Sequence, residues 1–287
     1  MTFFLRRPSA SPRQVPGPVV LVGMLAAVGV SAACTPEAVP AAGPATWGIS
    51  YEAPQRGSGA EAEFLRERHV LEAVRSSLAE QVRLPDGVTM TARSCKDAEA
   101  EYDPETGQIS VCYEFVAETR DLLRGEERSD RGEDRSDLDA DPDERVEGAL
   151  RETLYHEAAH ALIDKWELPF VGREEDVADQ FAAHQLIRQG ARGQRHLAAV
   201  ADTYGLYAAD DDPEDIDFSD EHSPDAARAA NYRCWLYGAR PGGHERLVDD
   251  TILTRGRSEG CEEEWEALRR GWEHLLKPYR EGRDGTS

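Results

Sequence analysis

A short stretch of the chain, residues 154–166, places two histidines and a glutamate where they could bind and use a metal ion. Its sequence, LYHEAAHALIDKW, contains His-Glu-x-x-His as His156, Glu157 and His160. Residues four apart on a helix lie on one face, about 5–6 Å apart, so both imidazoles could bind one Zn²⁺ at about 2.0–2.1 Å. Glu157 would then lie beside the open coordination position and take a proton from a water. The spacing therefore predicts a catalytic zinc site.

A catalytic zinc site needs a third protein ligand, and the segment GREEDVADQFAAH (172–184) supplies acidic candidates: Glu174, Glu175, Asp176 and Asp179. We select Glu175, because Asp179 then lies one turn further on the same face. There Asp179 could accept a hydrogen bond from the ring nitrogen of His156 that faces away from the metal. Glu174 is the alternative ligand, but it would put Ala178 at the orienting position. Acidic residues are also ordinary in a first helical turn, where the helix dipole favours them.

Hydrolysis of an acyl bond also needs a group that stabilises the developing negative charge. His222, in DEHSPD, precedes a predicted helix and is our candidate. Tyr102 and Tyr232 are the alternatives, and a loop or capping role is the competing interpretation of His222.

The elements that must position these residues are mainly helical. Apolar spacing predicts helices over 60–83, 143–167, 174–189, 194–208, from Pro224 onward with Ser223 as N-cap, and over 261–276. Alternating residues in GVTMTARSC and ISVCYEF, separated by the turn composition YDPETGQ, predict a β-hairpin. A short helix is expected after it. The class is therefore α+β.

Five cysteines occur, and their number suits an exported protein. If Cys34 carries lipid, the other four can pair in three ways. We favour Cys95 with Cys112 and Cys234 with Cys261, because these pairs close the shortest loops. A cysteine zinc site is the competing interpretation, and the lack of C-x-x-C spacing disfavours it.

The N-terminus has the pattern of a targeting segment. A basic start is followed by the uncharged apolar run VVLVGMLAAVGVSAA, which is short for a membrane-spanning helix and suits a signal peptide over residues 1–33. The run ends in VSAAC, which resembles a bacterial lipobox with Cys34 as the lipidated residue, although Ser31 replaces the usual leucine. An uncleaved anchor is the alternative. We therefore expect an extracytoplasmic protein attached to the membrane only through this signal or lipid.

Composition divides the remaining chain. Residues 34–59 are rich in Pro, Ala and Gly and predict a flexible tether. Residues 60–287 form the predicted domain, with a disordered acidic insert at about 125–144. The net charge of −23 makes nucleic acid and anionic membrane surfaces unsuitable partners. We expect a monomer.

These residues carry a resemblance to known proteins. The HExxH helix followed by a helix with E-x-x-x-D resembles the gluzincin zinc peptidases, although the spacer from His160 to Glu175 is shorter than in thermolysin. The stretches YDPETGQISVCYEF, HEAAHALIDKWELPFVGREEDVADQFA, DEHSPDAARAANYRCWLYG and GCEEEWEALRRGWEHLLKP resemble an uncharacterised bacterial family of zinc metallopeptidases. The resemblance implies a zincin-like domain. It also implies that the strand QISVCYEF is a sheet edge that pairs with an extended substrate.

The sequence thus predicts an exported metallopeptidase that holds one Zn²⁺ through His156, His160 and Glu175. Glu157 would act as general base on a peptide or protein substrate. The alternative is a zinc-binding surface lipoprotein without catalysis. A third interpretation is a protein without metal, in which HExxH occurs by chance.

Overall fold

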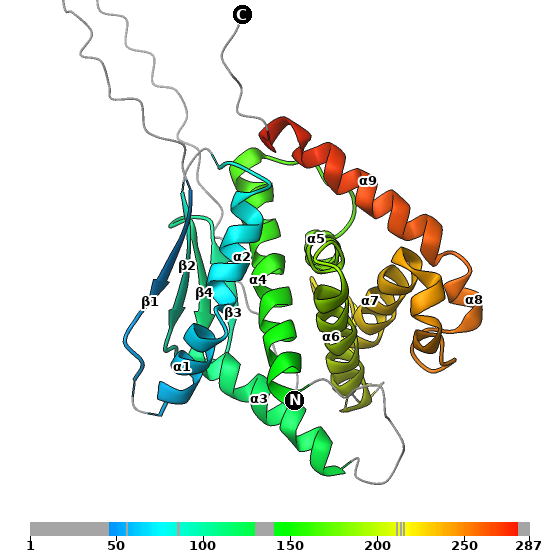
Figure 1. Cartoon of the computed structure of the whole chain (residues 1–287), viewed down its shortest axis with the longest axis horizontal. Coiled ribbons are helices and arrows are strands. Elements are labelled where there is room, and N and C mark those ends of the chain that lie inside the picture. Colours follow the sequence, from blue (N-terminus) through cyan, green and yellow to red (C-terminus); the bar gives the residue numbers. More distant parts are fainter. Residues whose placement is uncertain are drawn as a thin grey trace, which may run out of the picture.

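A central helix separates a small sheet from a group of helices in the computed structural model of the protein (Figure 1). The structure describes residues 46–55, 57–84, 87–129, 141–210, 212, 214 and 216–280. The elements are, in chain order, β1 (Trp47–Tyr51), α1 (Gly59–Glu67), α2 (Val70–Ala79), β2 (Val88–Arg93), β3 (Ala100–Asp103), β4 (Gln108–Cys112), α3 (Tyr113–Ser129), α4 (Pro142–Trp166), α5 (Glu174–Ile187), α6 (Ala191–Asp210), α7 (Asp225–Ala239), the 3₁₀ turns η1 (Pro241–Gly243) and η2 (Glu245–Leu247), α8 (Arg255–Ser258) and α9 (Cys261–Arg280). The predicted α+β class with a dominant helical part is confirmed.

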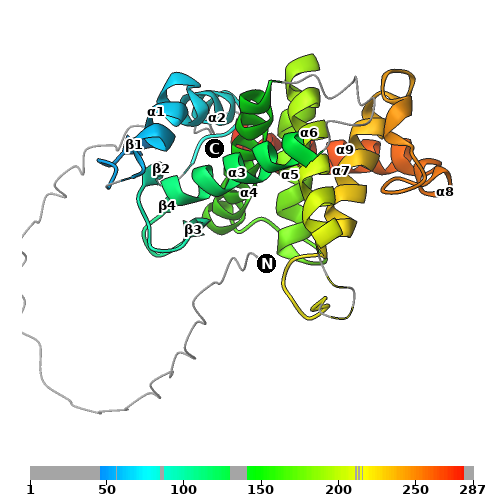
Figure 2. The same cartoon turned by 90° about the horizontal axis from the view of Figure 1, so that it is seen from below.

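The central helix α4 carries the HExxH motif and is buried around most of its circumference. The sheet and α2 lie on one side of it, and α5 and α6 pack on the other (Figures 1 and 2). Asp141 caps its first turn by accepting a hydrogen bond from the Asp143 amide, and Pro142 occupies the first helical position. Glu167 ends it in the left-handed conformation, with φ 47°. The long apolar face predicted for this segment therefore forms the middle of the core.

The sheet has the order β1-β2-β4-β3, in which β1, β2 and β4 are parallel and β3 is antiparallel to β4. The predicted hairpin between the segments of β2 and β4 is wrong. The chain after β2 first returns along β3, so that β4 inserts between β2 and β3 and runs parallel to β2. The hairpin is β3–β4, and Asp103 forms its turn by accepting a hydrogen bond from the Glu105 amide at 2.8 Å.

Two predicted flexible segments are partly ordered. Residues 47–51 of the expected tether form β1, which pairs in parallel with β2 and buries Trp47. The average composition of 34–59 hid this short alternating stretch, WGISY. The described flanks of the acidic insert are helical, as the end of α3 and the start of α4. Residues 130–140, the signal region 1–33 and the lipidation candidate Cys34 lie outside the described residues.

The helical boundaries differ from the predictions at two places. The segment 60–83 forms two helices, because His69 between α1 and α2 adopts φ 52° and interrupts the first. Ser223 is not the N-cap of α7; Pro224 precedes the first turn, and the Ser223 hydroxyl donates to Asp176 Oδ1 at 2.7 Å instead. None of the helices in the described part of the chain combines the length and apolar character needed to cross a bilayer.

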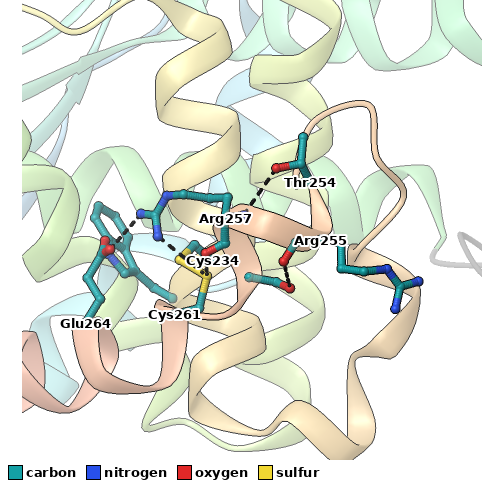
Figure 3. The surroundings of a disulfide bond; sticks show 8 residues. Cys234, Thr254, Arg255, Arg257, Cys261 and Glu264 are labelled. Carbon is teal, nitrogen blue, oxygen red and sulfur yellow. Dashed lines mark hydrogen bonds and ion pairs between the residues drawn. A yellow bond between two sulfur atoms is a disulfide. The ribbon is translucent and has the colours of Figure 1, made fainter.

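Both predicted cysteine pairs are disulfides. Cys95–Cys112 joins the loop after β2 to the end of β4, with Cα atoms 5.5 Å apart. Cys234–Cys261 joins α7 to the start of α9, with Cα atoms 5.0 Å apart (Figure 3). Beside the second bond, Arg257 pairs with Glu264 at 2.7 Å. The disulfides therefore fix the elements on both sides of the central helix.

Candidate metal centre

Two imidazoles meet on one face of α4. His156 and His160 lie one turn apart, and their Nε2 atoms are 3.2 Å from each other. Both side chains are only 4% exposed. The HExxH spacing thus produces the predicted pair of neighbouring ring nitrogens inside the protein.

Glu175 of α5 completes a set of three converging ligand atoms. Its Oε2 lies 2.9 Å from His156 Nε2 and 3.1 Å from His160 Nε2. Ligands at about 2.0–2.1 Å from a tetrahedral zinc are about 3.3–3.4 Å apart. The three measured separations are close to this spacing, so the donors fit one small divalent cation. Of the four acidic candidates, Glu175 is the one that reaches the histidine pair through Nε2 of both rings.

The opposite ring nitrogens show why these donors suit a cation. His156 Nδ1 lies 2.9 Å from Asp179 Oδ1, and His160 Nδ1 lies 2.8 Å from Glu174 Oε1. If each Nδ1–H donates to its carboxylate, each neutral ring turns the Nε2 lone pair towards the other ring and towards Glu175. The two Nε2 lone pairs and the Glu175 carboxylate then face one point and repel one another. A metal ion bound at that point would remove the repulsion. Asp179 therefore lies at the ring nitrogen where it was predicted, and Glu174 occupies the corresponding position at His160, a contact that the sequence did not predict.

Charges around His156 favour a positive species at this point. Burial by itself disfavours the charged ring, but hydrogen bonds to Asp179 and Glu175 outweigh it and raise the pKa of His156 to about 10. Burial would raise the pKa of Glu175, yet the bonds to His156 and His160 hold it far below its usual range. The same arrangement that attracts a proton attracts a metal ion.

Asp179 is itself held by a cation from α7. Arg228 donates to it twice, from Nε at 2.8 Å and from Nη2 at 2.6 Å, and the guanidinium lies 4.1 Å from the ring centre of Tyr204. Glu152, one turn before His156, accepts a hydrogen bond from the buried hydroxyl of Tyr232. Burial first, and then the charge of Asp179, raise the pKa of Glu152. A buried polar network thus supports the outer side of the histidine pair.

Glu157, the predicted general base, is buried and lines the cavity beside the histidine pair. Burial raises the pKa of Glu157, while the neighbouring His156 and His160 oppose the rise. The backbone N–H of Tyr102 in β3 also acts on this carboxyl in the direction that lowers its pKa. A carboxylate with a raised pKa suits a group that must accept a proton and release it again.

His222 reaches the same site from the loop before α7. Its Nε2 lies 3.0 Å from Glu175 Oε2, and its ring centre lies 6.1 Å from that of His156, nearly parallel to it. The two tyrosine alternatives are engaged elsewhere. The Tyr102 hydroxyl donates to Asp164 at 2.7 Å, and that of Tyr232 donates to Glu152. His222 is therefore the candidate that borders the metal position.

A cavity of about 710 Å³ opens beside this centre. His156, Glu157 and His222 line it, together with residues of α3, α6, α7 and the β3 segment. The implied edge strand is corrected here: β4 is paired on both sides, by β2 and by β3. The edge next to the site is β3, whose Ala100 lines the cavity.

Comparisons with known proteins agree with this chemistry. Neither the curated proteins nor the solved structures include a match to this chain. A family model described as "Putative metallopeptidase" matches residues 51–276, which contain every element of the centre. The chain belongs to this metallopeptidase family.

Proposed function

We propose that the protein is an exported zinc-dependent peptidase of gluzincin type. The observation that carries this proposal is the convergence of His156 Nε2, His160 Nε2 and Glu175 Oε2 within 3.2 Å of one another, with Glu157 beside them at a cavity. Three protein ligands and an open side are the arrangement of catalytic zinc sites. The two disulfides suit a protein of an oxidising compartment.

The residues around the metal position have separate tasks in this proposal. Zinc, when bound, supplies a Lewis acid that polarises the scissile carbonyl and makes a water more acidic. Glu157 accepts the proton of that water and passes it to the leaving amine. Asp179 and Glu174 keep the Nε2 lone pairs of their histidines on the metal side. His222, whose Nε2 borders Glu175, donates a hydrogen bond to the oxygen on which negative charge develops.

The cavity lining selects substrates by charge. Among the described residues that line the cavity, Arg228 is the one arginine or lysine, and it is already bonded to Asp179. The acidic lining residues are Glu118, Asp121, Glu152, Glu157, Asp212, Asp217, Asp220 and Asp225. A cleft with one sign of charge attracts ligands of the opposite sign and repels its own. We therefore expect peptides with lysine or arginine next to the scissile bond to be preferred over those with glutamate.

The proximity of His222 to Glu175 favours one competing function. If His222 were a fourth permanent ligand, the site would be closed, as in structural zinc sites. The protein would then be a non-catalytic zinc-binding module. A buried Glu157 at an open cavity is not needed in such a module and supports the enzyme.

The test combines metal analysis with hydrolysis of a fluorogenic peptide library. We expect about one zinc per chain by elemental analysis, lost in His156→Ala and retained in His274→Ala, which changes an exposed histidine of α9. Glu157→Gln should keep the zinc and lose hydrolysis. A zinc-loaded protein that cleaves no library peptide would support the module, and a folded protein that binds no zinc would refute both.

A further inference from the structure

The loop that carries His222 is attached to the first turn of α5 by an arginine. Arg173 precedes that turn, and its guanidinium donates to three backbone carbonyls of the loop, at Phe218 (3.2 Å), Asp220 (3.1 Å) and His222 (2.9 Å). These carbonyls belong to alternate residues, so the loop curls around one side chain. Arg173 is also two residues before Glu175, and its own carbonyl accepts the Val177 amide in the first turn of α5.

Further contacts hold the loop in the same place. The Ser223 hydroxyl donates to Asp176 of α5 at 2.7 Å. Within the loop, Asp220 Oδ1 accepts the His222 amide at 2.8 Å and lies 3.4 Å from His222 Nδ1. Arg173 before Glu175 and Asp176 after it therefore bind loop residues on both sides of the His222 imidazole.

We propose that Arg173 is a positioning residue that sets the distance between His222 and the metal centre. The consequence for catalysis rests on the function proposed above, whereas the positioning itself does not. Arg173 fixes the His222 backbone to α5, and the ring then stands with Nε2 3.0 Å from Glu175 Oε2. Without this attachment, the loop swings away and His222 no longer borders the reacting oxygen.

The chemistry of the contact requires an arginine. A guanidinium presents five N–H donors in a rigid planar fork and can bond several carbonyls at once. A lysine keeps the charge but offers a flexible point donor. The loop is strongly acidic, with Asp217, Asp220 and Glu221 in it, so charge attraction alone is the competing explanation. Arg173→Lys separates the two.

Hydrogen exchange tests the positioning without any need for activity. The amides of Ser219, Asp220 and His222 are hydrogen-bonded within the loop, and they should exchange about tenfold faster or more in Arg173→Ala. Arg173→Lys should recover only part of the protection. The control is Arg269→Ala, which removes an arginine bonded to Glu266 and Glu273 on α9 and should leave the loop unchanged. Unchanged exchange in Arg173→Ala, or full recovery by lysine, would overturn the proposal.

Kinetics on the zinc-loaded protein tests the consequence. Arg173→Ala should lower kcat by about tenfold or more with KM and zinc content close to wild type. Adding Arg173→Ala to His222→Ala should cause no further loss, because the two residues act as one unit. Additive losses would show that Arg173 acts other than through His222. If the wild-type protein cleaves no peptide, the proposed function fails, and the exchange experiment still decides the role of Arg173.

Discussion

Removal of the Asp179 charge is the sharpest test of how the metal centre is supported. Asp179 accepts three charge-assisted hydrogen bonds, one from His156 and two from Arg228, and it is buried. In Asp179→Asn, one side of the amide presents hydrogen-bond donors where the carboxylate had an acceptor. If the amide nitrogen takes the Oδ1 position, both His156 and Arg228 Nη2 lose their acceptor, and if it takes the Oδ2 position, Arg228 Nε loses its acceptor. In both orientations Arg228 loses the anionic partner that it bonds.

The expected size of the effect follows from burial. Loss of an orienting partner of a metal-bound histidine lowers metal affinity about 10–100-fold, which is about 1.4–2.7 kcal/mol. A buried ion pair that loses one partner destabilises a protein by about 3–5 kcal/mol. Glu174 lies 2.8 Å from His160 Nδ1, and its side chain is 30% exposed, so water can replace it at the imidazole. We expect Glu174→Gln to lower zinc affinity by about tenfold or less and to change stability by under about 1 kcal/mol.

The assay compares the two isosteric variants under identical conditions. Competition with a chromogenic chelator at pH 7.5 gives the zinc affinity, and urea unfolding of the zinc-free protein gives the free energy of unfolding. The variants should rank wild type, Glu174→Gln and Asp179→Asn in both measurements. An Asp179→Asn protein with wild-type affinity, or a Glu174→Gln protein with the larger loss, would refute the assignment of the two orienting carboxylates.

Three further predictions concern the framework. Burial, and then nearby arginines, lower the pKa of His184 to about 3. As the pH falls, His184 is protonated in the unfolded chain before it is protonated in the folded protein, so the free energy of unfolding decreases. His184→Gln should reduce this decrease between pH 6 and pH 4 by about 1.4 kcal/mol per pH unit. A Cβ at Gly238 of α7 would lie 2.1 Å from the Cys261 carbonyl oxygen, so Gly238→Ala should lower the Tm. A Cβ at the exposed Gly271 of α9 would meet nothing within 4 Å, so Gly271→Ala should raise the Tm slightly. Replacing Cys234 and Cys261 by serine opens a bond that spans 27 residues and should cost roughly 3.5 kcal/mol in urea unfolding.

The convergence of the candidate ligands could be predicted from the sequence because it depends on local geometry. His156 and His160 share a face of one helix, and Glu175 and Asp179 share a face of the next. Two helices with short connections can bring two such pairs together in few ways. Glu175 could be selected as the candidate ligand by one condition. One carboxylate had to reach the metal position while another, one turn away, reached the outer ring nitrogen of His156.

The parts that sequence reasoning missed are non-local. Arg228 is 49 residues from Asp179, and no local period relates them. The strand order failed for the same reason, because β2 and β4 have similar alternating patterns whether they pair in parallel or in antiparallel fashion. The sequence presented Glu174 only as an alternative metal ligand. In the structure it contacts the Nδ1 atom of His160, on the side of the ring that faces away from Glu175.

Arg173, which precedes α5, and the first three residues of that helix form a polar run whose side chains have four different sets of partners. Successive residues on a helix point about 100° apart, so Glu174, Glu175 and Asp176 face a ring nitrogen of α4, the candidate metal position and the Ser223 hydroxyl. Arg173, in extended conformation before the helix, reaches the carbonyls of the His222 loop. A general preference for acidic residues at helix N-termini accounts for the composition of the run and not for these partners. Because one rigid turn holds both Glu175 and the His222 loop, a small shift of α5 would move a metal ligand and the neighbouring histidine together. The N-terminus of α5 therefore couples the candidate metal ligands to the loop that carries His222.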